Sequence, residues 1–161
     1  MSGKAESRLI YNSISTSERV SNLGVKGALL FTWLITHCDT QGRMQGKSKV
    51  VKHLVVPIIE EITLSDVDEA LELMSKQKLI QLYKDDTGRT LIQVIDWWQW
   101  QTGLRYKAPS HFQAPPVWED QVTSRENGRF AKGDTDNGTV NGTGREEKRR
   151  DIEKKRSEAK P

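Results

Sequence analysis

The chain has 161 residues and a formal net charge of +3, and 35% of its residues are hydrophobic, below the ~45–50% of an average globular domain. No run approaches the ~18 apolar residues of a membrane span. The polar start lacks the apolar region of a signal peptide, so we expect a cytoplasmic protein with no membrane association. Apolar residues are dense from Leu9 to Phe112 and sparse afterwards. We therefore predict one domain over residues 1–116 and a disordered charged tail over residues 117–161.

The first predicted elements are helical. Ser17 is a candidate N-cap for a short helix. Residues 25–38 carry apolar side chains at the i, i+3, i+4 spacing of a core helix, and we expect Trp33 to be part of its buried face. Residues 39–42 suit a type I turn, and residues 43–44 suit a very short strand.

Two further helices are expected. Residues 47–56 favour a short basic helix that ends before Pro57. Its expected apolar side is Val50, Val51, Leu54 and Val55, and its expected polar side is Lys47, Lys49, Lys52 and His53. The next helix, over residues 65–78, has Ser65 as its expected N-cap and acidic residues in its first turns. Its expected buried stripe is Val67, Ala70, Leu71 and Met74.

Two strands follow, over residues 80–84 and 90–96, and Gly88 lies in the hairpin loop between them. The element order is helix, short strand, helix, helix, strand, loop, strand. This order predicts an α+β fold, a winged helix-turn-helix in which the hairpin loop is the wing. We expect Trp97 to lie in the core, whereas the sequence leaves open whether Trp98 and Trp100 are exposed.

Short motifs in this order resemble the N-terminal winged-helix module of phage replisome organisers and DnaD-like replication initiation proteins. The motifs are residues 39–43, the helix ending near Pro57, the run 78–80, Trp97 with Gln101, and residues 109–112. The resemblance covers roughly residues 8–116 and implies a role in replication initiation. Those proteins often continue into a second helical domain, which nothing after Trp118 resembles, so the functions of that domain are not transferred.

In a DNA-binding helix-turn-helix, the second helix of the motif enters the major groove. Here that helix is 65–78, whose mainly acidic exposed positions form a poor surface for a polyanion. We expect phosphate contacts from the basic residues elsewhere in the domain, for which ordinary solvated side chains are the alternative interpretation. The candidate DNA-binding residues are Lys47, Ser48, Lys49, Lys52, Lys84, Arg89, Arg105 and Lys107.

The sequence favours no enzyme, metal or cofactor. Cys38 is the only cysteine, which excludes an intramolecular disulfide, and its apolar helical surroundings predict a buried, inert thiol. His37, His53 and His111 are scattered, and none has metal-ligand spacing with Cys38. No glycine-rich phosphate loop is present.

The leading hypothesis is a DNA-binding protein of phage-type replication initiation, with DNA and host or phage replication proteins as partners. The rival is a winged-helix scaffold for protein contacts or homo-oligomer formation, with the acidic helix as its working face. A transcriptional regulator shares the fold and would require a preferred DNA sequence. The mixed-charge run 145–160 is interpreted as a solvated tail, with an electrostatic arm on DNA as the alternative.

Overall fold

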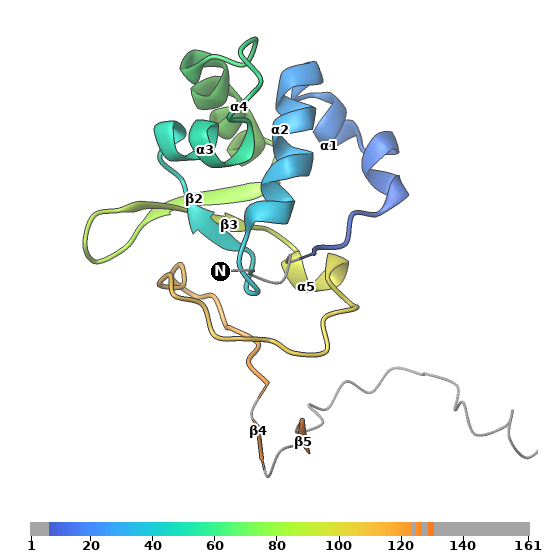
Figure 1. The fold of residues 1–161 in the computed structure, drawn as a ribbon, viewed down its shortest axis with the longest axis vertical. Helices are drawn as coiled ribbons and strands as arrows, with labels where there is room; N and C mark the ends of the chain where they lie inside the picture. The colour runs from blue at the N-terminus through green and yellow to red at the C-terminus, as the bar shows by residue number, and fades with distance from the viewer. Residues whose placement is uncertain (1–6, 124, 127–128, 131–161) are drawn as a thin grey trace, which may run out of the picture. The chain divides into compact units, whose positions relative to one another are not determined.

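The computed structural model in Figure 1 describes residues 7–123, 125–126 and 129–130. The chain divides into two units, Met1–Ala131 and Lys132–Pro161. All described residues belong to the first unit. The predictions for residues 131–161, including the solvated run 145–160, lie outside the described residues.

The described residues combine helices with a small sheet. They form, in chain order, a 3₁₀ helix at Asn12–Thr16, α1 at Glu18–Ser21, α2 at Gly24–His37, β1 at Arg43–Gln45, α3 at Ser48–Val55, α4 at Leu64–Lys76, β2 at Ile80–Lys84, β3 at Thr90–Val94, α5 at Trp97–Trp100, β4 at Arg125–Glu126 and β5 at Arg129–Phe130. Strands β1, β3 and β2 form an antiparallel sheet with β3 in the middle, and β4 pairs with β5. This confirms the α+β class, and the arrangement is compatible with a winged-helix-like fold.

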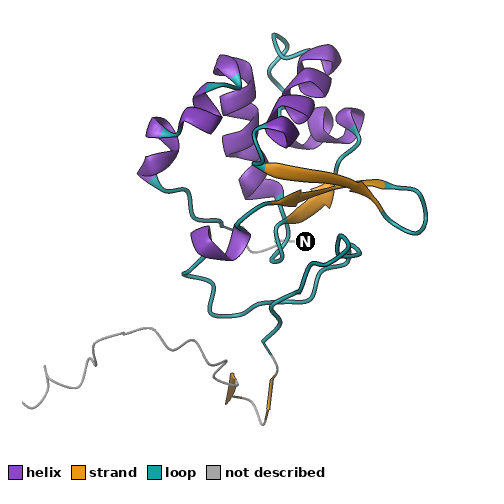
Figure 2. Cartoon of the chain, turned by 180° about the vertical axis from the view of Figure 1, so that it is seen from behind, coloured by secondary structure: helices purple, strands orange, loops and turns teal. Residues whose placement is uncertain are grey.

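One face of the sheet packs against the helices. Met44 and Leu82 both lie opposite Ile92 in the strand register, and this apolar row belongs to the same core as the buried side chains of α2, α3 and α4. Because side chains alternate along a strand, Arg43 and Gln93 are on the other face. Figure 2 shows the helices on one side of the sheet and the chain after α5 on the other.

The N-terminus of α4 is capped by Thr63, not by Ser65 as predicted. The Thr63 side chain accepts a hydrogen bond from the Asp66 N–H, and the Asp66 side chain accepts one from the Thr63 N–H, which completes a capping box. Thr63 and Ser65 are both suitable cap residues, and the local sequence does not show which of them begins the helix. The predicted stripe is confirmed: Val67, Ala70, Leu71 and Met74 are all buried.

The structure corrects two side chains of the predicted core. Trp33 is 38% exposed and Leu54 is 49% exposed. Trp33 lies on α2, where the buried stripe includes Leu30 and Leu34. Leu54 lies on α3, where the buried residues are Val51 and Val55. A helix buries only one side, and its periodicity alone did not decide which edge residues stay outside.

Other packing predictions are confirmed. Ser17 caps α1 by accepting a hydrogen bond from Val20 N–H. Cys38 is 2% exposed, and burial raises the pKa of its thiol, so the thiol stays protonated. Trp97 is 1% exposed, and its indole N–H donates to the Thr40 carbonyl at 2.8 Å.

The segment after β3 departs from the extended prediction for residues 90–96. Strand β3 ends at Val94, and Asp96 takes a left-handed conformation with φ of 56°. The chain then turns into the single-turn helix α5. Trp98 is half-buried and Trp100 is 38% exposed, which settles the two positions that the sequence left open.

Residues 106–123, here named the C-terminal strap, cover the polar face of the sheet. Tyr83 Oη donates to the Gln113 carbonyl at 2.6 Å, and the backbone N–H of Thr123 donates to the Lys107 carbonyl at 3.0 Å. The prediction that disorder begins at residue 117 is therefore wrong for residues 117–123. Tertiary hydrogen bonds offset the ordering entropy of a segment too polar to form its own core.

Candidate nucleic-acid interface

The connection between β1 and α3 lies beside the base of the β2–β3 hairpin. The Gly46 N–H donates to the Thr90 carbonyl at 2.9 Å, and Lys84 is the register partner of Thr90 on β2. Lys47, the N-cap of α3, follows Gly46 directly. Gly46 and Lys84 therefore lie on either side of Thr90, and Lys47 is the next residue after Gly46. We name Lys47, Lys49 and Lys84 the wing-base lysines.

The hairpin loop is organised by one carboxylate. Asp85 accepts hydrogen bonds from Thr87 N–H and Oγ at 3.0 and 2.7 Å. It also accepts from Arg89 N–H and Nε at 2.9 and 2.7 Å. The fourth loop position, Gly88, has φ of 79°, which glycine adopts without strain. The Arg89 side chain is thus engaged within the loop, although it remains 54% exposed.

These bonds predict a pH dependence of hairpin stability. The hydrogen bond from Thr87, followed by the bonds from Arg89, lowers the pKa of Asp85 from 3.8 to about 2. The native state therefore binds fewer protons here than the unfolded state, and the stabilisation is complete above pH 3.8 and lost as the pH falls through about 2. The difference in free energy of unfolding between the wild type and Asp85→Asn is expected to be constant above about pH 5 and to shrink towards pH 2. Urea titrations of both proteins measure it, and a difference that does not change with pH would contradict it.

Two predicted contact residues on α3 have structural partners. Lys52 Nζ donates to the carbonyls of Val56 and Ile59 at 3.0 and 2.5 Å, which satisfies acceptors at the C-terminal end of α3. Ser48 Oγ donates to the Asp68 carboxylate of α4. Lys52 thus stabilises the C-terminal end of α3, and Ser48 links α3 to α4.

The two remaining candidates, Arg105 and Lys107, follow α5 in the chain. Lys107 Nζ is 4.5 Å from the centre of the Trp98 ring, and it donates to Gln121. Arg105 is exposed. The structure therefore does not gather all eight candidates into one surface. Those with exposed cations and no ion-pair or hydrogen-bond partner among the described residues are Lys47, Lys49, Lys84 and Arg105.

The acidic face of α4 is partly neutralised. Lys26 Nζ lies 2.9 Å from both Asp66 carboxylate oxygens, and this bond is the main reason that the pKa of Asp66 is lowered to about 2. Asp68 accepts from Ser48. Glu69 lines a surface hollow with the start of α2, and Glu72 is exposed. Glu69 and Glu72 thus remain as exposed acids of α4.

Sequence reasoning missed a buried polar network between the sheet and the strap. Arg43 is fully buried, and its guanidinium donates to Gln93 Oε1 at 2.8 Å and to both carboxylate oxygens of Asp120. Gln41, also fully buried, donates to the carbonyls of Ala108 and Gln121, both at 2.7 Å. The available signal was the alternation of polar and apolar residues in β1 and β3, which marks a second sheet face that needs partners.

Comparison of the chain with models of known protein families, with curated proteins and with solved structures gave no match. Within residues 7–123, no helix is long and apolar enough to cross a bilayer. The same residues contain no group of three or more histidine, cysteine or acidic side chains placed to hold a metal ion.

Proposed function

We propose that this domain is a winged-helix module that binds duplex DNA through phosphate contacts at the wing base. The observation that carries the proposal is that the β1–α3 connection lies beside the β2–β3 hairpin, with Gly46, which Lys47 follows, on one side of Thr90 and Lys84 on the other. Lys49 extends this set along the first turn of α3. These exposed lysines have no ion-pair or hydrogen-bond partner among residues 7–123, so their ammonium groups can replace the counterions of a phosphate backbone.

The proposed contact is not specific for base sequence. The helix in the recognition position, α4, exposes Glu69 and Glu72, and acidic side chains at a groove are repelled by phosphates. Phosphate contacts position a protein on a duplex but carry no direct sequence information. The resemblance to phage replisome organisers supports placing this DNA contact in replication initiation, and a preferred operator sequence would instead favour the transcriptional regulator.

The test is fluorescence anisotropy of a labelled duplex across a salt series. The variant K47Q/K49Q/K84Q removes three cations. Each lost phosphate contact should reduce the steepness of log affinity against log salt by ~0.9, so the loss of all three should reduce it by up to about 2.7. The matched control is Arg105→Gln, which removes an exposed cation outside the wing base that has no ion-pair or hydrogen-bond partner within the described part of the chain. It is expected to leave the slope unchanged.

Three results would contradict the proposal. Equal slopes for the wild type and the triple variant would exclude the wing base, and an equal effect per charge from Arg105→Gln would indicate attraction by net charge alone. No duplex binding at low salt would favour the protein-interaction module, for which exposed Glu69 and Glu72 are the available face. Lys52→Glu is not a suitable probe, because it breaks the hydrogen bonds at the end of α3.

A further inference from the structure

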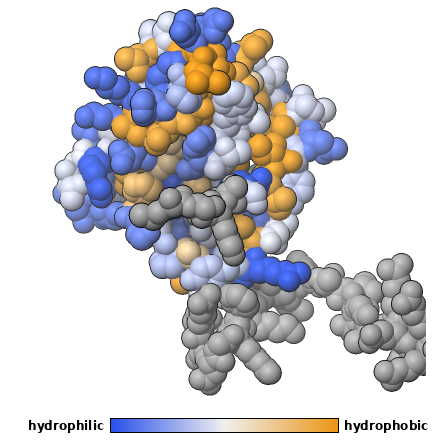
Figure 3. All heavy atoms as spheres, viewed as in Figure 1, coloured by the Kyte–Doolittle hydropathy of each residue, from blue (hydrophilic) through white to orange (hydrophobic). Residues whose placement is uncertain are grey.

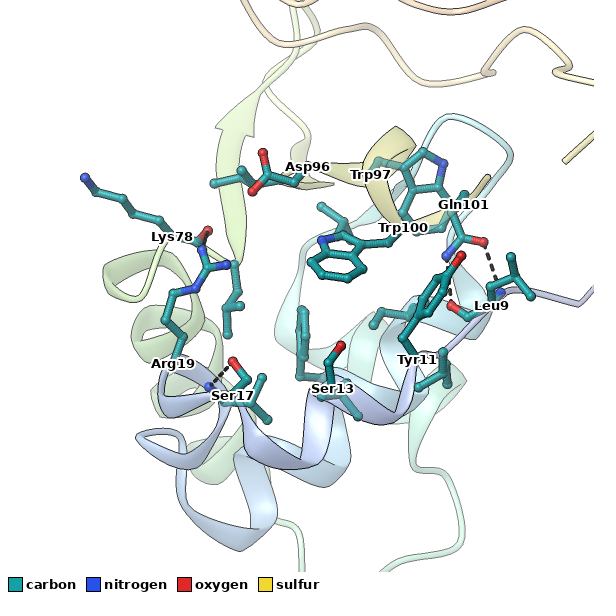
Figure 4. Close-up of a pocket in the computed structure, with 18 residues that line it drawn as sticks. Leu9, Tyr11, Ser13, Ser17, Arg19, Lys78, Asp96, Trp97, Trp100 and Gln101 are labelled. Atoms are coloured by element: carbon teal, nitrogen blue, oxygen red, sulfur yellow. Dashed lines mark hydrogen bonds between the residues drawn. The ribbon is translucent and has the colours of Figure 1, made fainter. Parts of the chain in front are cut away.

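A cavity of about 260 Å³ lies beneath the N-terminal segment, between that segment, α2 and α5 (Figure 4). Its inner walls are mainly apolar and aromatic. They include Val20, Phe31, Ile35, Leu79, Trp97 and Trp100. Engineered apolar cavities of ~150 Å³ take up benzene, so this volume is sufficient for a small organic molecule.

The N-terminal segment forms the outer wall of this cavity and is attached to the end of α5. The Gln101 side chain makes a reciprocal pair with the backbone of Leu9, with its Oε1 accepting from N–H at 3.0 Å and its Nε2 donating to the carbonyl at 2.9 Å. Tyr11 and Trp100 meet edge to face with ring centres 5.7 Å apart. Apolar surface is exposed along this side of the molecule in Figure 3. These contacts thus hold the outer wall in place, and the space behind it is mainly apolar.

The charged residues of the cavity lie at one opening. They are Arg19, Lys78 and Asp96 (Figure 4). In Figure 4 the Arg19 guanidinium and the Ser17 hydroxyl lie on one side of the opening, whereas Asp96 lies across it and the Lys78 ammonium points away. Among the described residues, the guanidinium makes one long hydrogen bond, 3.3 Å from Arg19 Nη1 to the Lys78 carbonyl, so donors remain for a ligand.

We propose that the cavity binds a small aromatic carboxylate, with its ring against Trp100 and Phe31 and its carboxylate at Arg19. Apolar walls with a few convergent polar groups are typical of small-molecule sites. The planar guanidinium matches a carboxylate with two parallel hydrogen bonds, and the Ser17 hydroxyl can donate a third. The proposal does not depend on DNA binding, because none of the wing-base lysines lines this cavity.

The first measurement is calorimetric titration of the full chain with 2-naphthoate and with its neutral analogue naphthalene-2-carboxamide. The two probes have nearly the same shape and differ in charge. We expect 2-naphthoate to bind at least about tenfold more tightly, since a hydrogen bond to a charged group contributes more than a neutral one. Shifts of the Trp100 indole N–H resonance would place either probe in the cavity.

Four variants separate the charges. Arg19→Gln is expected to weaken 2-naphthoate about tenfold and to abolish the preference over the amide. Lys78→Gly removes a distant cation at a left-handed position, with φ of 55°, where glycine introduces no strain. It should therefore weaken binding only about twofold through long-range charge. Asp96→Asn removes the opposing carboxylate and should strengthen binding. The matched control, Lys49→Gln, should change nothing.

Each outcome of these measurements either supports or overturns the proposal. Selective binding of 2-naphthoate that Arg19→Gln removes would support the proposal. Equal binding of both probes, or unchanged binding in Arg19→Gln, would overturn the carboxylate assignment. Failure of both probes to bind at about 1 mM would overturn the ligand site. Filling the opening with Ser13→Trp should abolish binding while leaving the circular dichroism spectrum unchanged, and retained binding would place the probe elsewhere.

Discussion

Replacing Arg43 with methionine is expected to lower the free energy of unfolding by about 1–3 kcal/mol, because it leaves the buried Gln93 acceptor unsatisfied and removes the ion pair with Asp120, whose side chain is 28% exposed. Arg43 is fully buried and its guanidinium donates to Asp120 of the strap and Gln93 of β3. Methionine keeps most of the volume but leaves both acceptors without their donor. The strap should therefore loosen before the rest of the domain unfolds.

Denaturant unfolding measures the stability of the whole domain, and hydrogen exchange measures the loosening of the strap. The reciprocal change, Asp120→Asn, leaves the buried guanidinium with a weaker acceptor and should also destabilise the domain. The control, Arg105→Met, removes an exposed arginine, and its free energy of unfolding should stay within about 0.5 kcal/mol of the wild type. Truncation after residue 116 removes Asp120 and should match the loss in Asp120→Asn or exceed it. A truncated domain as stable as the full chain would contradict an integral strap.

The second large effect is expected at Gly42. This residue has φ of 82°, and a Cβ placed on it would lie 2.5 Å from Trp97 Cδ2. Gly42→Ala therefore combines left-handed strain of ~1–2 kcal/mol with overpacking of ~1–3 kcal/mol, a total of about 2–5 kcal/mol. The ring cannot move freely, because it is buried and its indole N–H donates to the Thr40 carbonyl.

Gly88→Ala is the matched control for this prediction. Gly88 also has a left-handed backbone, with φ of 79°, but a Cβ there would meet nothing within 4 Å. Its substitution should therefore show the left-handed strain alone, about 1–2 kcal/mol. Thermal unfolding of the two variants measures the difference. Equal losses would mean that the Trp97 contact has no energetic role, and Gly42→Ala would then reflect only the backbone conformation.

Local signals in the chain were sufficient for most of the fold. The residues of β2 were predicted as they occur, because β-branched and aliphatic residues next to a glycine-containing loop indicate a hairpin. The apolar stripe of α4 and the buried Cys38 follow from helical periodicity. These features depend on residues close together in sequence, and this is why the α+β class could be predicted without the structure.

The candidate site was only partly predictable. Positive charge identified Lys47, Lys49 and Lys84 as candidate DNA contacts, but charge alone did not distinguish them from Lys52, whose ammonium binds two backbone carbonyls. A lysine in solvent and a lysine at a helix end have the same sequence signature. Only the fold shows which acceptors lie within reach.

Tertiary structure alone decided the order of the strap and the role of Arg43. Residues 117–123 have too few apolar side chains to order themselves, yet they form hydrogen bonds with Gln41 and Arg43, about 80 positions earlier in the chain. Pairings over such separations leave no local pattern, because each partner looks like an ordinary polar residue. The sequence by itself therefore determined the helices, the hairpin and the helix-facing core, and the fold determined which polar groups are buried together.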